Sequence, residues 1–454
     1  MTITEQLVDW AWTLDVAQVP AEVRHAAGRH FLDGTGTAVA GYRYQAATYA
    51  AAVAERTPAP PESTTIGSGR RLPAAQAAFT NGTLVHALDF DDTHAGALVH
   101  ATAAVLPATY AAGERAGADG STLLGAAIAG FETVTRIGRA VPHGFHSRGF
   151  HATSVCGVFA AALVASRLTG LSAIQAVNAL GIAGSLASGS LEFLSDGSST
   201  KQLHPGWSAL AGITAADLAA AGATGPATIL EGEYGLFRAY TGKSVAESAV
   251  LDGLGEDWET SKITIKPYPL CQLSHASLDA LSQLRGDIGD AELIETIEFR
   301  IPQASVPIVC EPHSTKLEPR TPYEAKFSLA WDAAALLVDG QIGVATFDDL
   351  DRPEVRDLAK RVSYESYETA TVPASAPGRV EVRLRDGRQL TAETPSSRGG
   401  PDNPLTDQEL VAKFVDNCGP ATSDPAGLAN EILDLAGIAD LSKLLSRTTV
   451  REDT

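Results

Sequence analysis

Histidines gather in two short windows of this sequence, and histidine is the side chain best suited to proton transfer near neutral pH. Any single histidine is about as often a surface or capping residue as a functional one. Six of the eleven histidines nevertheless fall in these windows: His86, His94 and His100 in the first, and His143, His146 and His151 in the second. Such clustering indicates a site for acid–base chemistry.

Three acids follow the first of these histidines within a few residues: Asp89, Asp91 and Asp92, at the end of an apolar pattern that predicts a helix over 73–89. Packed carboxylates repel one another, so they need partners. A metal ion, the start of the next helix, or histidines and a lysine held in place would each serve. The alternative without function is that Asp91 and Asp92 cap the next helix while Asp89 is solvated.

Other kinds of site have less support. The D-F-D-D run resembles the acidic motif of class II terpene cyclases, but aromatic residues are only 6% of the chain, and a carbocation pocket needs many aromatic faces. No carboxylate and histidine set has metal-ligand spacing, and the four cysteines are scattered without a CxxC pair. We therefore expect no metal ion, no disulfide and reduced cysteines.

The composition is that of a large acidic globular protein. The chain has 454 residues, 44% of them hydrophobic, and a formal net charge of −20. That length suffices for a large core and two domains, and that charge repels nucleic acid and anionic membranes. Because no apolar run approaches about 18 residues and no signal peptide is recognisable, we expect a cytoplasmic protein. A polycarboxylate pocket would have to concentrate basic side chains locally.

Helical patterns dominate both ends of the chain. From about 4 to 242 the sequence is rich in Ala, Leu and Gly with helical periodicity, which predicts a bundle. Small residues within 172–190 predict a helix buried at its centre. Helical patterns return over 408–418 and 428–435, and we expect these helices to pack on the first bundle.

Strand patterns are confined to the middle segment. Residues 294–301 alternate like a half-buried strand, and 379–394 read as two strands joined by Asp386-Gly387. The sequence thus predicts a mainly α protein with two domains. These are a large all-helical domain over 1–262, completed by 404–454, and a smaller α+β lid domain over 263–403.

Five segments, in this order, resemble the MmgE/PrpD superfamily. They are NGTLVHALDFDDTH (81–94), RGFHAT (148–153), SSTKQLHPG (198–206), KPYPLC (266–271) continuing to His275, and YEAKFSL (323–329). One motif alone would be moderate evidence, but together they span nearly the whole chain.

The resemblance implies a homodimer with its active site where the helical domain meets the lid. It also implies one of the family's activities, which are dehydration of 2-methylcitrate, decarboxylation of cis-aconitate and epimerisation of iminodisuccinate, all without metal or organic cofactor. The catalytic residues carried over are Asp89, Thr93, His100, His151 and Lys201, of which the first two hold the loop and the others reach substrate. Candidates for substrate binding are Arg148, His146, Lys266, Cys271 and His275.

Those activities share a proton removed or delivered at a carbon next to a carboxylate, where cationic groups must stabilise the developing negative charge. His151 is our first candidate for the acid or base and His100 the second. Lys201, in a Ser/Thr/Gly-rich segment read as a loop, would hold a carboxylate; the alternative is an ordinary surface lysine.

The sequence also departs from the family pattern. In the similar itaconate-forming decarboxylases, a functional histidine occupies the position of Cys271 and a functional tyrosine the position near Val306, and neither side chain is present here. His146 replaces a tyrosine of many relatives, and its role stays open. We expect a cofactor-free lyase that dehydrates a 2-methylcitrate-like hydroxy acid. The alternatives are a dicarboxylate epimerase or racemase, a cis-aconitate-type decarboxylase, and an inactive acid-binding or scaffold protein.

Overall fold

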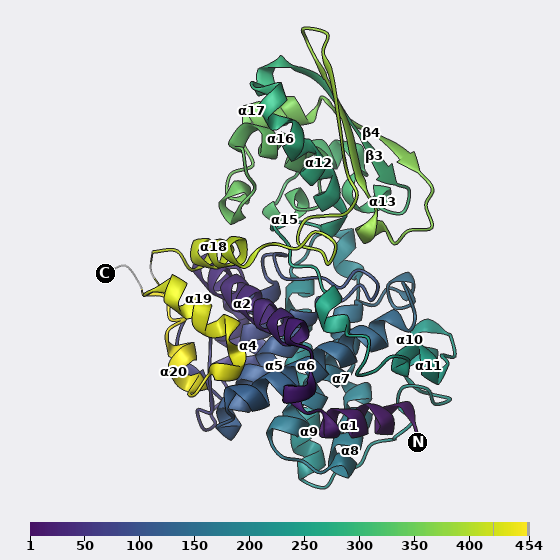
Figure 1. Ribbon diagram of the computed structural model, residues 1–454, viewed down its shortest axis with the longest axis vertical. Coiled ribbons are helices and arrows are strands. Elements are labelled where there is room, and N and C mark those ends of the chain that lie inside the picture. Colours follow the sequence, from purple (N-terminus) through teal and green to yellow (C-terminus); the bar gives the residue numbers. More distant parts are fainter. Residues whose placement is uncertain (421, 452–454) are drawn as a thin grey trace. The chain divides into compact units, whose positions relative to one another are not determined.

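The computed structural model describes residues 1–420 and 422–451 and is mainly helical (Figure 1). The chain divides into two compact units. Unit 1 combines Met1–Ile265 with the segment from Thr406 onward, and unit 2 is Lys266–Leu405. The predicted fold class, mainly α with a smaller α+β part, is confirmed. No helix of the described residues has both the length and the apolarity that a membrane span needs.

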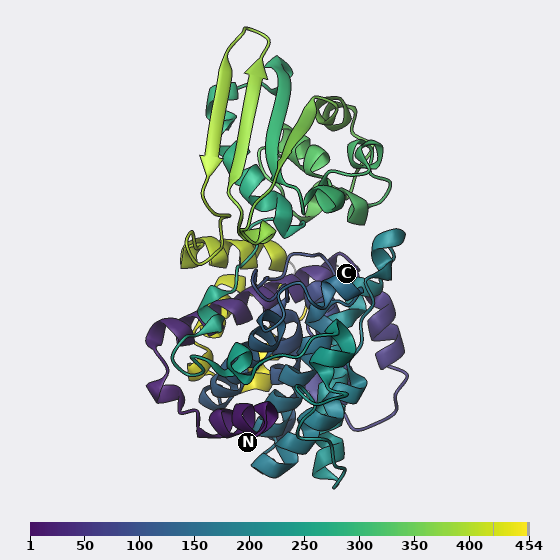
Figure 2. The ribbon, with the colours of Figure 1, turned by 90° about the vertical axis from the view of Figure 1, so that its right-hand side faces the viewer.

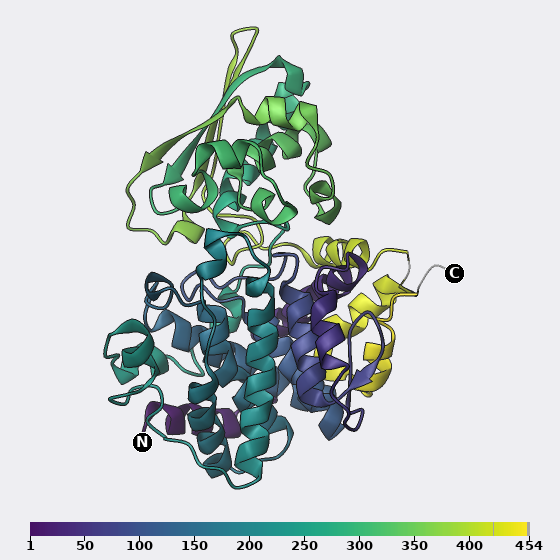
Figure 3. The ribbon, with the colours of Figure 1, turned by 180° about the vertical axis from the view of Figure 1, so that it is seen from behind.

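Unit 1 is a helical bundle with one two-stranded hairpin. Its α-helices are α1 (Ile3–Thr13), α2 (Ala21–Arg43), α3 (Thr48–Ala54), α4 (Ala74–His86), α5 (Ala101–Ala116), α6 (Gly120–Arg139), α7 (Ala152–Leu168), α8 (Ala173–Leu186), α9 (Thr200–Ala220), α10 (Leu236–Thr241), α11 (Glu247–Leu251), α18 (Asp407–Cys418), α19 (Pro425–Leu433) and α20 (Leu441–Ser446). The hairpin joins β1 (Ser63–Thr64) to β2 (Arg71–Leu72). Helices α18 and α19 pack on α2, although the whole of unit 2 lies between them in the sequence (Figure 3).

The centre of the bundle is α7, in which every residue except Arg167 is buried and around which α5, α6, α8 and α9 pack. The prediction that the helix within 172–190 lies at the centre was wrong. That segment forms α8, which buries only part of its surface and leaves Ile174 77% exposed. Its small residues serve a different contact: a Cβ on Gly181 would lie 2.5 Å from the backbone of Gly225. Gly181 thus admits the loop at Gly225, while α8 also packs on α7 and α9.

A crossing of two glycines lets α4 and α9 approach backbone to backbone. A Cβ on Gly206 of α9 would lie 2.3 Å from the Phe79 carbonyl oxygen, and one on Gly82 of α4 would lie 2.8 Å from Gly206 Cα. Only glycine fits at so close an approach. The crossing sets the end of α4 beside the start of α9, where Gln202 Nε2 donates to the Ala87 carbonyl oxygen at 2.9 Å.

Unit 2 is an α+β fold. Its helices are α12 (Gln272–Ile288), α13 (Val306–Val309), α14 (His313–Leu317), α15 (Pro322–Ala325), α16 (Leu329–Asp339) and α17 (Pro353–Ala359), and its strands are β3 (Ile294–Pro302), β4 (Val362–Tyr367), β5 (Gly378–Leu384) and β6 (Gln389–Thr394). The sheet order is β4-β3-β5-β6, with only the β3–β4 pair parallel (Figure 2). Both expected strand patterns are confirmed, and Gly387 in the β5–β6 turn has φ +90°.

Candidate active site

Three histidines from three helix ends of unit 1 meet in one buried cluster. His86 is the last residue of α4, and His100 and His151 are the N-cap residues of α5 and α7. The ring centroid of His86 lies 4.5 Å from that of His100 and 5.7 Å from that of His151. The His100 and His151 ring centroids are 5.9 Å apart. We call His86, His100 and His151 the histidine cluster.

Two of the three acids hold this cluster and the helix that follows it. Asp91 Oδ2 lies 2.7 Å from His86 Nδ1 and 3.4 Å from His100 Nδ1. Asp92 Oδ1 accepts from the Thr102 backbone N–H at 3.1 Å, in the first turn of α5. The capping alternative is therefore confirmed for Asp92, whereas Asp91 serves the histidines.

Asp89 pairs with Lys201, and both side chains are buried. Lys201 Nζ donates to Asp89 Oδ1 at 2.7 Å, with the two residues 8% and 3% exposed. A solvated Asp89 and a surface Lys201 are thus both wrong. Lys201 lies in the first turn of α9 rather than in a loop, because Ser199 and Thr200, which read as loop residues, begin the helix. Asp89 has φ +55°, a left-handed conformation that aspartate adopts more readily than most residues.

Backbone groups fix the orientation of His100. Its Nδ1 lies 2.9 Å from the Asp92 carbonyl oxygen, which can only accept a hydrogen bond. The proton therefore belongs on Nδ1, and Nε2 is the basic nitrogen. Thr93 Oγ1 is 3.3 Å from the same Nδ1, and Thr93 exchanges two backbone hydrogen bonds with Thr264, each 2.9 Å long. Thr93 thereby ties the loop of acids to the end of the Met1–Ile265 part of unit 1.

Another lysine closes this loop from the C-terminal segment. Lys413 of α18 lies 3.7 Å from the centroid of the Phe90 ring and donates to the Phe90 carbonyl oxygen at 3.1 Å. It also forms an ion pair of 2.6 Å with Asp33 of α2. Phe90 stands between Asp89 and Asp91 in the chain, so Lys413 holds the turn that presents both carboxylates.

Two further histidines extend the cluster. His204 Nδ1 lies 3.0 Å from His151 Nδ1, and the His146 ring lies 6.1 Å from the His151 ring. His86 belongs to the first histidine window but was not among the expected site residues, and His204 was not singled out from the sequence. A helical interpretation of the segment 198–206 would have found His204, because residues three apart, such as Lys201 and His204, share a helix face.

The imidazoles of His146, His151 and His204 are neutral near pH 7. Burial is the main cause that lowers the pKa of His146 and of His204 to about 4, and Lys201 adds to both shifts. Burial also lowers the pKa of His151 well below 6.5, with smaller contributions from His204, His86, Lys201 and His100. The N-termini of α7 and α9 carry partial positive charge that acts in the same direction. The neutral rings are suited to accept protons.

Side chains from separate elements come close enough to share a metal ion. Two sets have ligand atoms within 4.8 Å of one another: His86 with His100 and His151, and Asp89 with Asp91 and His100. Spacing along the chain could not reveal them, since the members are brought together only by the fold. In the second set both carboxylates already pair with a cation or an imidazole. The first set offers the three imidazoles that zinc accepts.

The remaining expected residues lie elsewhere. Arg148 is exposed at the end of η2 (His146–Arg148). The other three belong to unit 2, where Lys266 is 1% exposed and Cys271 is the N-cap of α12. His275 is fully buried, with Nε2 3.1 Å from the Leu270 carbonyl oxygen. The structure therefore brings the five expected catalytic residues and His146 together in unit 1. Arg148 also belongs to unit 1, but it is exposed.

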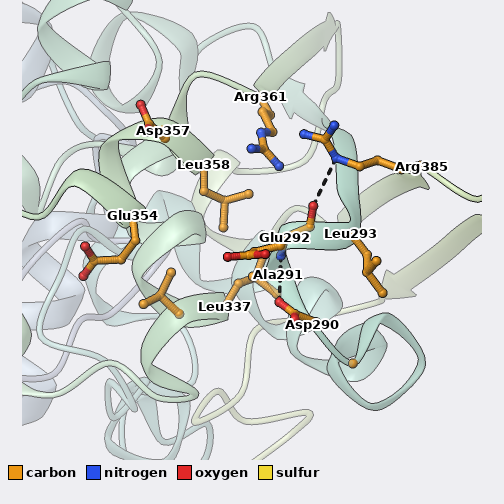
Figure 4. A pocket seen from close by; sticks show the side chains of 12 residues that line it. Asp290, Ala291, Glu292, Leu293, Leu337, Glu354, Asp357, Leu358, Arg361 and Arg385 are labelled. Atoms are coloured by element: carbon orange, nitrogen blue, oxygen red, sulfur yellow. Dashed lines mark hydrogen bonds between the residues drawn. The ribbon is translucent and has the colours of Figure 1, made fainter.

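A large pocket of unit 2 is a poor alternative site. It measures about 1020 Å³, and Figure 4 shows Arg361 and Arg385 beside its wall. Arg385 Nε donates to the Glu292 carbonyl oxygen at 3.1 Å. Four carboxylates also line this pocket, those of Asp290, Glu292, Glu354 and Asp357. Since acids outnumber arginines and no expected site residue lines it, the pocket does not suit a polycarboxylate.

Comparison with known families identifies the family of the chain. Residues 5–249 match the MmgE/PrpD N-terminal domain, and residues 268–436 match the MmgE/PrpD C-terminal domain. The chain belongs to the MmgE/PrpD family. The resemblance predicted from the five motifs is thereby confirmed.

Relatives of this MmgE/PrpD protein include three cis-aconitate decarboxylases. That of Aspergillus terreus is 30% identical over 98% of this chain and 95% of its own length. That of Mus musculus is 30% identical over 84% and 80%, and that of Homo sapiens 31% identical over 76% and 73%. Family and relatives together support an enzyme of the lyase type.

Proposed function

We propose that this MmgE/PrpD-family lyase acts on a small di- or tricarboxylate without an organic cofactor, and that its reaction is dehydration of a 2-methylcitrate-like hydroxy acid. The observation that carries the proposal is the meeting of neutral, buried imidazoles with the Lys201 ammonium. We further propose that the working form is a homodimer, which sedimentation of the purified protein would test.

The helix ends explain how an acidic protein could hold a polyanion. His100 and His151 are the N-caps of α5 and α7, and Lys201 lies in the first turn of α9. A helix N-terminus carries roughly half a positive charge and presents backbone N–H groups, both of which favour a carboxylate. Three such ends place positive partial charge around Lys201, whose own charge is paired with Asp89, in a chain with net charge −20. Because the chain as a whole is acidic, a polycarboxylate site needs such a local concentration of positive charge.

The roles follow from the contacts. His151 Nε2 would take the proton from the carbon next to a carboxylate, since Nδ1 of the same ring faces His204. Lys201 would stabilise the enolate-like charge that develops, while Asp89 keeps its ammonium in position. His100 would protonate the departing hydroxyl from Nε2 once that nitrogen has taken up a proton, because its Nδ1 proton stays hydrogen-bonded to the Asp92 carbonyl oxygen.

Decarboxylation of cis-aconitate is the second candidate, because the three relatives named above carry that activity in their names. Cys271 weighs against it, since a thiol at the N-cap of α12 cannot replace the functional histidine expected at that position. A dicarboxylate epimerase or racemase would use the same proton removal and return the proton instead of losing a leaving group.

The test is turnover by the purified protein of 2-methylcitrate, citrate, cis-aconitate and iminodisuccinate. Dehydration of 2-methylcitrate should raise the alkene absorbance. Decarboxylation would instead release CO₂, and epimerisation would incorporate deuterium from D₂O without a new alkene. If the folded protein neither turns over nor exchanges deuterium into any of these acids, the proposed function is wrong.

A further inference from the structure

A pair of histidines joins the buried cluster to an open pocket of unit 1. His151 is 3% exposed, whereas its partner His204 is only half-buried. His204 also lines a pocket of about 530 Å³, together with Phe193 and Trp207. Trp207 is 45% exposed, so this pocket is reached by water. His204 therefore stands between the buried histidine and the solvent.

The contact between the two rings requires a shared proton. Two imidazole nitrogens 3.0 Å apart hold together only if one of them donates and the other accepts. With the proton on His151 Nδ1, the Nε2 of that ring is left as the basic nitrogen. His204 then accepts at Nδ1 and carries its own proton on Nε2. This is the tautomer that the proposed role of His151 needs.

The Nδ1 atoms of the other two cluster members face groups of a different kind. His86 Nδ1 faces Asp91, and His100 Nδ1 faces the Asp92 carbonyl oxygen. A carbonyl oxygen carries no proton onward, and Asp91 is itself fully buried. The His151–His204 pair, in contrast, links a cluster imidazole directly to a second imidazole at a pocket wall.

We propose that His204 is a proton-relay residue that restores His151 after each turnover, an inference that rests on the function proposed above. His151 takes a proton from substrate carbon on Nε2 and passes its Nδ1 proton to His204 Nδ1. His204 in turn releases its Nε2 proton to water in the pocket, so one proton leaves the substrate and one reaches solvent. After the product leaves, water entering the site takes the Nε2 proton of His151. His204 then regains a proton on Nε2 from water in the pocket and returns its Nδ1 proton to His151 Nδ1, which restores both starting tautomers.

The low basicity of His204 suits this task. Burial lowers its pKa to about 4, with help from His86 and Lys201, so the ring passes a proton on instead of retaining it at neutral pH. Position is fixed by the helix: His204 is in α9, and its backbone carbonyl oxygen accepts from Ser154 Oγ of α7 at 3.2 Å.

The experiment is chemical rescue of His204→Ala. Removing the ring should lower kcat at least about tenfold with little change in KM, a modest part of what general acid–base catalysis contributes. Added imidazole should restore kcat with saturation, because it can enter the pocket where the side chain was, and a series of substituted imidazoles should rescue according to their pKa. His313→Ala, at an exposed histidine of α14, is the matched control and should respond to neither change.

Two measurements keep the proposal falsifiable. His204→Gln retains an amide oxygen that can accept from His151 Nδ1–H but cannot relay a proton, so it should show the same loss of kcat while staying folded. Full kcat in either folded variant, or a loss in His204→Ala that no imidazole restores, overturns the relay. If the wild-type protein turns over none of the acids, the proposed function is wrong, and kinetics can no longer test the relay. The relay is then judged by ¹⁵N NMR, which must show His151 Nδ1 protonated and His204 Nδ1 unprotonated.

Discussion

Replacing Lys201 by Met removes an ammonium and keeps an unbranched stem. The pair that it breaks is buried, with Asp89 3% and Lys201 8% exposed and 2.7 Å between the charged atoms. Removing one partner of a buried ion pair leaves the other charge uncompensated, at a cost of about 3–5 kcal/mol. We expect Lys201→Met to lower the free energy of unfolding by that amount.

A second substitution separates folding from catalysis. In the double variant Lys201→Met/Asp89→Asn neither charge remains, and neutral replacement of a buried pair is often nearly without cost. Most of the lost stability should return. Activity should not, because the substrate still lacks its electrostatic partner, and we expect kcat/KM to stay at least about 10²-fold below wild type in both variants.

Urea unfolding followed by circular dichroism gives the stability, and initial rates with the acid that wild type turns over give kcat/KM. Lys360→Met is the matched control, since Lys360 is 53% exposed and its surface pair with Asp357 is worth at most about 1 kcal/mol. A double variant that recovers near-wild-type kcat/KM would refute the electrostatic role of Lys201. Unchanged stability of the single variant would refute the buried pair.

Five further outcomes are expected. His151→Gln should lower kcat/KM by roughly 10²–10⁴-fold, and near-normal turnover of the folded variant would exclude His151 as the acid or base. Because the lowered pKa of about 4 for His146 and His204 lies below the unfolded value of 6.5, the unfolded chain binds more protons between these values, so the free energy of unfolding should fall as pH drops from 6.5 toward 4. Neutral histidines should likewise keep the acid limb of kcat/KM below about pH 6, and a limb near the ordinary histidine pKa of about 6.5 would contradict their burial. Exhaustive chelation should leave turnover unchanged, whereas loss restored by one divalent ion would make the histidine cluster a metal site. Gly206→Ala should destabilise by about 1–3 kcal/mol because its Cβ would meet the Phe79 carbonyl oxygen, while Gly286→Ala, where a Cβ meets nothing, should not.

The sequence predicted most of what local patterns determine. Alternation and the Asp386-Gly387 pair predicted β3 and the β5–β6 hairpin, because pleated strands and tight turns leave their pattern within a few residues. The ordered motifs likewise predicted the family. The interpretation of Lys201 as a loop residue was wrong because Ser and Thr favour loops and helix starts alike.

What the sequence could not show is which helix ends meet. His86 and His204 are far apart along the chain, and their neighbourhood depends on the approach of α4 and α9 at Gly82 and Gly206. The prediction that the helix within 172–190 lies at the centre of the bundle was wrong for the same reason. Small residues indicate a close approach but do not say whether the partner is a helix or, as beside Gly181, a loop.

The contact of Lys413 with Phe90 has a consequence for biosynthesis. These residues are separated by 323 positions, so the turn that presents Asp89 and Asp91 leaves the ribosome long before the lysine that closes it. All of unit 2 is translated in between. A nascent or prematurely terminated chain therefore exposes the acidic turn and the Asp33 carboxylate without their cation, and such chains should depend on chaperones until α18 has emerged.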